Sequence, residues 1–352
     1  MRIAAIPGDG IGVEVLPAAV DVIDAALSVS GERIEWTWLD WGCTYFVDNG
    51  RMMPSDGLDV LAQHDAIFLG AVGRPDVPDH ESLWGLLIPI RREFDQYVNL
   101  RPIKIFDGLV PRVSLPPGRT VDLVIVRENT EGEYSDVGGR FARGTAREFA
   151  VQENIFTRVG VERIARYACE LAATRSHSLT SATKSNGIIH TMPFWDDVVG
   201  EVVSAYPDIT CTSALVDALA ADLVLRPYAH DVIVASNLFG DILSDIAAAV
   251  VGSIGIAPSA NLNPERLHPS MFKPVHGSAP LIAGRGIANP IAAVWSGALM
   301  LEHLGHSDAA DLVMRAVAES LADPATRTGD LDGTATTAQV RDFLVSSVAS
   351  HS

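Results

Sequence analysis

The sequence predicts an α/β protein with a largely parallel sheet. Short apolar runs that are typical of buried strands alternate along the chain with segments whose apolar residues recur at helical spacing. This alternation is the pattern of strand-helix-strand units, in which helices cover a mostly parallel sheet. The 352 residues suffice for two domain-sized cores or one large two-lobed unit.

The individual elements follow in chain order. Residues 2–7 predict the first strand, and Leu16, Val20, Ile23 and Leu27 predict a helix after it because they share one helical face. Further strands are predicted at residues 34–39, 66–72, 121–126 and 232–236. Further helices are predicted at residues 58–63, 159–173, 241–251 and 291–301.

Residues 133–151 interrupt the pattern, because they have no helical period. Gly138-Gly139 indicates a turn, and the side chains from Thr145 to Val151 alternate between polar and apolar. We expect a hairpin that projects from the body. A mobile surface loop is the alternative that the pattern leaves open.

Composition excludes several classes of protein. No stretch approaches the ~20 apolar residues of a membrane span, and the first residues lack the pattern of a signal peptide. Cys43, Cys169 and Cys211 are isolated, which argues against a disulfide framework and fits a cytoplasmic location. The net charge of −18 disfavours nucleic acid and anionic membranes as partners, and a site for a small anion would need a local cluster of arginines.

A glycine-rich segment follows the first predicted strand. Its sequence, Gly8-Asp9-Gly10-Ile11-Gly12, does not have the G-x-G-x-x-G spacing of a Rossmann dinucleotide site, and no acidic residue ends a strand about 20 residues later. The sequence therefore does not predict a Rossmann fold.

Two aspartates are the first candidates for a metal site. Asp241 and Asp245 are four residues apart, so a helix would place them on one face. Paired carboxylates of this kind suit Mg²⁺ or Mn²⁺. The alternative is that Asp241 only stabilises the positive end of a helix from its first turn, although this explains Asp245 less well.

Three arginines are the candidates for an anion site. Arg127 comes directly after the apolar strand at 121–126, where α/β sheets commonly place ligand contacts. Arg91 and Arg101 lie nearby in the sequence, and guanidinium groups match carboxylates in two-pronged hydrogen bonds. Taken alone, Arg91 and Arg101 are explained better by surface ion pairs. Arg127 is the exception, because the strand before it is apolar throughout.

Other residues become informative only in combination. Lys184 lies in a polar loop, Tyr134 follows an acidic segment, and Asp217 stands on an otherwise apolar helix, where it needs a partner at a site or an interface. His276-Gly277-Ser278-Ala279-Pro280 and Ile287-Ala288-Asn289-Pro290 form a pair of small-residue loops that permit close approach to a ligand, or that simply connect elements.

Together these motifs resemble the β-decarboxylating dehydrogenase family, which includes isocitrate, 3-isopropylmalate and D-malate/tartrate dehydrogenases. The combination of Asn237-Leu238-Phe239-Gly240-Asp241-Ile242-Leu243-Ser244-Asp245 with the His276 loop is specific, and the resemblance covers nearly the whole chain. It implies the isopropylmalate-dehydrogenase-like two-lobed α/β fold with a shared central sheet. Residues 1–98 and 252–352 would form a discontinuous large, cofactor-binding domain, and residues 99–251 a small domain with the dimerisation arm at about 133–151.

The resemblance also implies roles for the candidate residues. Arg91, Arg101 and Arg127 would bind the carboxylates of a 2-hydroxy dicarboxylic acid, and Asp241, Asp245 and the partner subunit's Asp217 would hold Mg²⁺ or Mn²⁺. Tyr134, Lys184 and Asp217 would be catalytic in a homodimer with shared active sites. NAD would bind at Asn186, His276, Gly277, Ser278, Ala279, Leu281 and Asn289, and a monovalent cation such as K⁺ is a further candidate cofactor.

Within the family, the chain resembles the D-malate/tartrate branch. The segment that leads to Arg91 carries Trp84, a bulky side chain where a C3 substituent of the substrate would point, which favours D-malate or tartrate. The alternative for Trp84 is a core tryptophan. The alternative functions are 3-isopropylmalate dehydrogenase and a non-catalytic regulatory subunit, which the retained Lys184, Tyr134 and aspartates disfavour.

One residue departs from the family pattern. Relatives that use NAD carry an aspartate after the His276 loop, where it binds the adenosine ribose and repels the 2′-phosphate of NADP, whereas this chain has Leu281. We therefore expect a high KM for NAD and modest discrimination against NADP, for which Arg285 is the nearest cation in the sequence.

Overall fold

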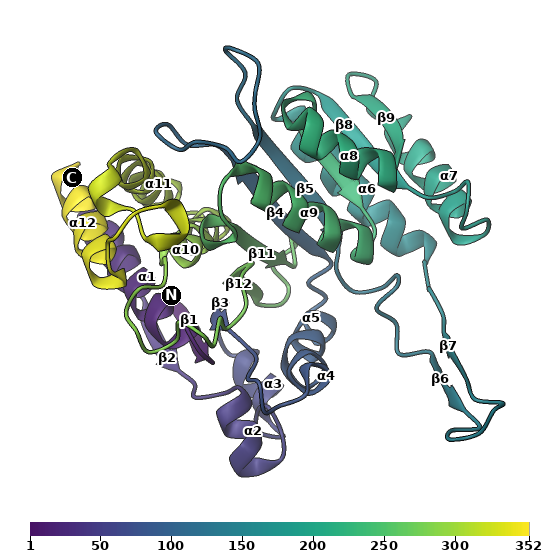
Figure 1. Ribbon diagram of the computed structural model, residues 1–352, viewed down its shortest axis with the longest axis horizontal. Helices are drawn as coiled ribbons and strands as arrows, with labels where there is room; N and C mark the ends of the chain where they lie inside the picture. The colour runs from purple at the N-terminus through teal and green to yellow at the C-terminus, as the bar shows by residue number, and fades with distance from the viewer. Residues whose placement is uncertain (352) are drawn as a thin grey trace.

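The computed structural model describes residues 1–351, so that Ser352, the last residue of the predicted large domain, lies outside the described part. It confirms the α/β class (Figure 1). Ten strands form one sheet in the order β2-β1-β3-β12-β11-β4-β5-β10-β8-β9. The strands are β1 (Arg2–Gly8), β2 (Glu35–Trp38), β3 (Ala66–Ala71), β4 (Val98–Lys104), β5 (Asp122–Glu128), β8 (Ser178–Thr183), β9 (Thr210–Leu215), β10 (Val232–Ala235), β11 (Pro258–Leu262) and β12 (Ser270–Pro274).

The sheet is parallel at both ends and antiparallel in the middle. β11 runs antiparallel to β12 and to β4, and β4 runs antiparallel to β5. A Rossmann sheet is parallel throughout and has a different strand order, so the fold is of another type, as the sequence predicts. The sheet divides at the β11–β4 pair. β11 and the strands beyond it, β12, β3, β1 and β2, come from residues 1–98 and 252–352. β4, which begins at Val98, and the strands beyond it, β5, β10, β8 and β9, come from the intervening part of the chain.

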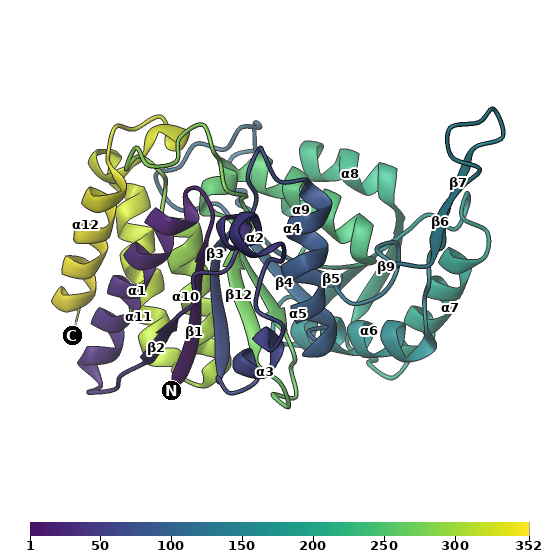
Figure 2. The ribbon, with the colours of Figure 1, turned by 90° about the horizontal axis from the view of Figure 1, so that it is seen from below.

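Helices cover both parts of the sheet. On the side of β1, helix α1 (Gly12–Val29) packs with α10 (Ile291–Leu304), α11 (Ser307–Ala322) and α12 (Thr337–Ser350) (Figure 2). The other helices are α2 (Cys43–Asn49), α3 (Gly57–Leu61), α4 (Asp79–Ser82), α5 (Ile88–Glu93), α6 (Arg158–Ala173), α7 (Thr191–Val203), α8 (Val216–Leu225) and α9 (Asn237–Val251). No helix among the described residues has the length and apolar character needed to cross a membrane.

A two-stranded hairpin projects from the body, at the opposite end from both chain termini (Figures 1 and 2). It consists of β6 (Gly138–Phe141) and β7 (Phe149–Gln152), which pair antiparallel. The predicted hairpin is therefore confirmed and the open-loop alternative is wrong. Phe141 and Phe149 stack with ring centroids 4.9 Å apart, yet both remain exposed.

Candidate active site

The two candidate metal-binding aspartates lie on α9, which directly follows β10. The helix begins at Asn237, four residues before the predicted start, so Asp241 lies in its second turn. The favourable field of a helix N-terminus fades within the first turn, which weakens the explanation of Asp241 as a helix-end charge. Arg101 reaches both carboxylates, at 3.1 Å from Asp241 Oδ1 and 3.4 Å from Asp245 Oδ1. Both aspartates therefore face one site.

The arginines converge on Asp241 from neighbouring strands. Arg127 lies near the carboxyl end of β5, which pairs parallel with β10, so its side chain meets the start of α9. Its guanidinium donates to Asp241 Oδ1 and, at 2.7 and 3.0 Å, to the Asn237 amide oxygen. Arg101 on β4 also donates to Ser244 Oγ at 2.5 Å. Burial alone would raise the pKa of Asp241, but Arg127 and Arg101 lower it to about 2, so its carboxylate is ionised.

Arg91 differs from the other two arginines because it has no counterion. It lies on α5 and is buried, and none of its side-chain nitrogens has a hydrogen-bond partner or ion pair among residues 1–351. Burial, together with repulsion from Arg127 and Arg101, lowers its pKa to about 9, which still leaves it charged at neutral pH. A buried cation without a partner is costly, so this guanidinium is placed to receive an anion.

Tyr134 joins the same cluster from the loop that leads to the hairpin. Its hydroxyl donates to Asp241 Oδ2 at 2.8 Å, and Arg127 lies over its ring, 5.5 Å from the centroid. Burial and the negative charge of Asp241 raise the pKa of Tyr134. The phenol is therefore protonated at neutral pH and borders the arginine site.

Arg92 links Trp84 to this cluster, because it contacts both the Trp84 ring and the Tyr134 carbonyl. Trp84 belongs to a π-helical segment, Leu83–Leu87, between α4 and α5. The guanidinium of Arg92 lies 5.1 Å from the Trp84 ring and donates to the Tyr134 carbonyl at 3.0 Å. Trp84 is 36% exposed, so it is not a buried core residue.

Lys184 and Asp217 form a separate, exposed pair. Lys184 Nζ lies 2.6 Å from Asp217 Oδ1, and Asp217 stands in the first turn of α8. Lys184 lowers the pKa of Asp217. Within residues 1–351 no three side chains are placed together as a metal site, so one chain does not bring Asp217 to Asp241 and Asp245. Asn186, in the same loop as Lys184, is exposed.

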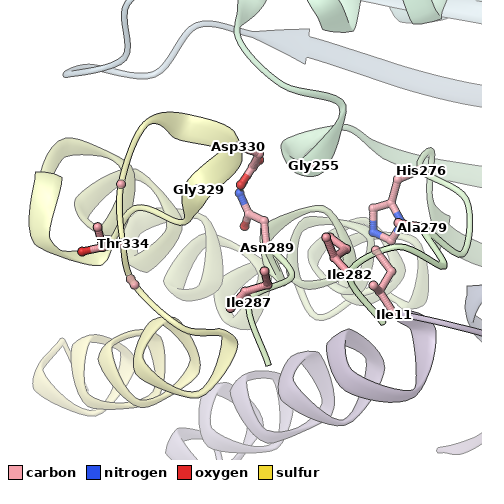
Figure 3. A pocket seen from close by; sticks show the side chains of 12 residues that line it. Ile11, Gly255, His276, Ala279, Ile282, Ile287, Asn289, Gly329, Asp330 and Thr334 are labelled. Carbon is pink, nitrogen blue, oxygen red and sulfur yellow. Dashed lines mark hydrogen bonds between the residues drawn. The ribbon is translucent and has the colours of Figure 1, made fainter. Parts of the chain in front are cut away.

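A cavity of about 510 Å³ lies beside the His276 loop (Figure 3). The His276 ring contacts the Gly277 carbonyl at 2.9 Å through Nδ1, and its Nε2 is buried without a partner. Burial lowers the pKa of His276 to about 4, so the ring is neutral at pH 7. The lining residues are Ile11, Gly255, His276, Ala279, Ile282, Ile287, Asn289, Gly329, Asp330, Gly333, Thr334 and Ala335.

Comparison with known proteins identifies the family. The sequence profile of the isocitrate/isopropylmalate dehydrogenases matches residues 2–344. The chain belongs to the isocitrate/isopropylmalate dehydrogenase family.

Individual relatives are similar over their whole length. D-malate dehydrogenase (decarboxylating) of Escherichia coli is 53% identical over 98% of this chain and 97% of the relative. Tartrate dehydrogenase/decarboxylase of Pseudomonas putida is 52% identical over 96% and 95%. The crystal structure of isocitrate dehydrogenase from Methylococcus capsulatus superposes with a TM-score of 0.89 at 36% identity, covering 99% of both chains. The predicted resemblance to the D-malate/tartrate branch is thereby confirmed.

In this family member, the structure divides the predicted cofactor residues into two groups. His276, Ala279 and Asn289 line the cavity, whereas Gly277, Ser278, Leu281 and Asn186 do not. Ser278 still shapes the wall, because its carbonyl accepts from the Ile11 amide at 2.9 Å. Leu281 is 91% exposed at the adjacent turn.

The structure also adds residues that the sequence does not predict. Asp330 lines the cavity and accepts from the Asn289 amide at 3.1 Å. Ile11 lines the cavity, so the Gly8–Gly12 segment contributes to its wall without being a Rossmann site. Gly10, at φ +57, must be glycine because a Cβ atom there would lie 2.1 Å from the Ser278 carbonyl oxygen. Lys273 is buried close to the arginines. A lysine inside an apolar strand is the one sequence signal that could have pointed to it.

Proposed function

We propose that this protein oxidises a small 2-hydroxy dicarboxylic acid, D-malate or a tartrate, with NAD and with Mg²⁺ or Mn²⁺, and that decarboxylation accompanies the oxidation. The observation that carries the proposal is the unpaired, buried guanidinium of Arg91 beside Arg101 and Arg127. Arg101 and Arg127 pair with Asp241 and Asp245, whereas Arg91 pairs with no carboxylate among residues 1–351, so we infer that a dicarboxylate supplies the missing negative charge. The names of the E. coli and P. putida relatives supply the substrate class.

The side chains at the site fit a divalent cation. Asp241 and Asp245 offer hard carboxylate oxygens on one face of α9, and two protein carboxylates are too few for a firm site. We propose that Asp217 of the partner subunit is the third ligand, because this carboxylate is exposed on its own chain. When bound, the cation lowers the proton affinity of the C2 hydroxyl of the substrate.

The cavity beside His276 fits a dinucleotide. It combines apolar side chains with a small number of polar groups, and the unpartnered Nε2 of His276 marks a place for a hydrogen-bonding ligand (Figure 3). His276, Ala279 and Asn289 would hold NAD there, and the nicotinamide would supply the acceptor for the hydride from C2.

Two residues carry the proton transfers, Lys184 and Tyr134. Lys184 of the partner subunit, acting as the unprotonated amine, takes the proton from the C2 hydroxyl as the hydride leaves, and the ammonium group that forms is stabilised by the partner subunit's Asp217. The resulting 2-keto acid then loses CO₂ from its β-carboxylate and becomes an enolate. Tyr134 donates its phenolic proton to C3 of that enolate, and Arg127 beside its ring stabilises the phenolate that forms. The product from D-malate is pyruvate.

A panel of substrates tests this function. D-malate, the tartrate isomers, 3-isopropylmalate and isocitrate are compared by kcat/KM, each with NAD or NADP, with Mn²⁺ or with excess chelator. We expect D-malate or one tartrate to give the highest value and chelator to abolish turnover. A preference for 3-isopropylmalate would assign the alternative substrate, and no NADH formation from any acid would favour a regulatory subunit.

Trp84 provides a variant for the same panel. Trp84→Ala should narrow the gap between D-malate and 3-isopropylmalate, because it enlarges the space for a C3 substituent; a methylene-sized difference is worth ~1–3 kcal/mol. Trp38→Ala is the matched control, since Trp38 is partly exposed on the edge strand β2. An unchanged substrate ratio in Trp84→Ala would show that Trp84 does not border the substrate.

A further inference from the structure

Lys273 is a buried lysine without a counterion. It lies on β12, between β3 and β11 in the middle of the sheet, and is 9% exposed. Its ammonium group donates to the Pro274 carbonyl at 2.5 Å, and no carboxylate among residues 1–351 lies within ion-pair distance. A single main-chain carbonyl compensates poorly for the loss of water around an ammonium group.

The strand directs this side chain toward the substrate site. Alternate residues of a strand share a face, so Lys273 faces the same side as Met271, which packs in one cluster with Leu86 and Ile90 from the segment that carries Trp84 and Arg91. Burial and repulsion from Arg91 and Arg101 lower the pKa of Lys273 to about 7, whereas Asp241 and Asp245 act in the opposite direction. A bound carboxylate would favour the charged ammonium form further.

The same ammonium group also interacts with the cofactor side. Lys273 contributes to the lowered pKa of His276, whose ring lines the cavity. Lys273 thus stands on β12 three residues before His276, which lines the cavity, and within electrostatic reach of the arginine cluster. Four basic side chains (Arg91, Arg101, Arg127 and Lys273) then face two acidic ones (Asp241 and Asp245).

We propose that Lys273 is a fourth cation of the substrate site, whose ammonium group leaves the Pro274 carbonyl and binds a substrate carboxylate on the side that faces the cofactor cavity. The proposal rests on the dicarboxylate function argued above. The flexible four-carbon stem of lysine allows the ammonium group to turn between these two acceptors. The consequence is selectivity for dicarboxylates over monocarboxylates.

The small number of lysines makes a direct test possible. The chain contains Lys104, Lys184 and Lys273 and no other lysine, so protein labelled with ¹³C at the lysine ε-carbon gives three side-chain resonances, assigned with Lys273→Met and Lys104→Met. We expect saturating D-malate with Mg²⁺, without NAD, to shift the Lys273 resonance and to leave the Lys104 resonance unchanged. A Lys273 resonance that does not move at saturation overturns the proposal.

Binding measurements separate this proposal from the function on which it rests. By calorimetry, Lys273→Met should weaken D-malate binding ~10- to 100-fold, the effect of losing a hydrogen bond to a charged group, with little change for D-lactate. Lys104→Met, at an exposed lysine, should change neither. If Arg91→Met weakens D-malate binding and Lys273→Met does not, the inference about Lys273 is wrong. If Arg91→Met has no effect, the proposed function itself is wrong.

Discussion

At the scale of single residues, charge balance explains the candidate site. Asp241 accepts hydrogen bonds from Arg127 and Tyr134 and forms an ion pair with Arg101. Asp245 has one long contact to Arg101 and is half-exposed, and burial is the main reason why its pKa is raised. Asp245 therefore has the more available carboxylate, and it is the better position for testing the metal.

Asp245→Asn should preserve the fold and lower turnover on the order of 10²-fold or more, because the amide keeps the shape and removes a charged metal ligand. Turnover is measured with saturating Mn²⁺ beside circular dichroism of the variant. Asp311→Asn, at an exposed position on α11, is the matched control. Near-normal turnover of Asp245→Asn would contradict the assignment of this aspartate as a metal ligand.

Leu281 is the residue that decides the expected cofactor constants. Leu281→Asp should lower the KM for NAD and raise it for NADP, since a carboxylate would accept from the ribose hydroxyls; such bonds are worth ~1.5–3 kcal/mol. Leu267→Asp is the control, because Leu267 is also a largely exposed leucine and lies on a loop that does not line the cavity. If both constants stay unchanged in Leu281→Asp, this side chain does not face the ribose.

Among the elements, the hairpin of β6 and β7 exposes large apolar side chains that no other part of the same chain, over residues 1–351, covers. Val137, Phe141, Phe149 and Val151 are exposed on or beside it, and two strands alone are marginally stable in water. We propose that the hairpin packs against a second copy of the chain, as a homodimer requires.

Phe141→Ser combined with Phe149→Ser should shift the protein from dimer toward monomer in sedimentation velocity. Turnover should fall with the dimer fraction, because Lys184 and Asp217 would act in the partner's site. Val110→Ser, at an exposed apolar residue outside the hairpin, should change neither quantity. A variant that is monomeric and fully active would disprove shared active sites.

At the scale of the whole molecule, the chain concentrates positive charge at one place in an acidic protein. Its net charge is −18, yet the arginine cluster has more basic than acidic side chains. The β11–β4 pair joins the two groups of strands. We propose that these groups are the two domains, with the substrate bound where they meet.

Buried histidines predict how stability depends on pH. Burial lowers the pKa of His303 to about 4, against ~6.5 in the unfolded chain, so the unfolded state binds more protons between these values. The stability that His303 contributes is present above pH ~6.5 and is lost as pH falls toward 4, on the order of 3 kcal/mol. His303→Gln should flatten the decline in the free energy of unfolding, measured with urea from pH 7 to 4. His80→Gln, at an exposed histidine, should follow the wild type, and an equal decline in all three proteins would contradict the assignment.

Local sequence patterns suffice to predict several helices and strands. The helices and strands around Leu16, Ile67 and Val234 have the predicted type because periodicity and β-branched content act within a few residues. The sequence also predicts that Asp241 and Asp245 share a helix face and that Arg127 lies near the end of a strand. Both are local properties, since they depend only on residue spacing and on the apolar run before Arg127.

Relations between segments that are distant in the sequence become apparent only in the folded chain. The antiparallel direction of β4 and β11, the missing counterion of Arg91, and the burial of Lys273 all depend on which strands pair and which side chains pack across them. Asp330 joins Asn289 at the cavity although 41 residues separate them. Burial and charge pairing are sums over such non-local neighbours, which is why no local pattern in the chain specifies them.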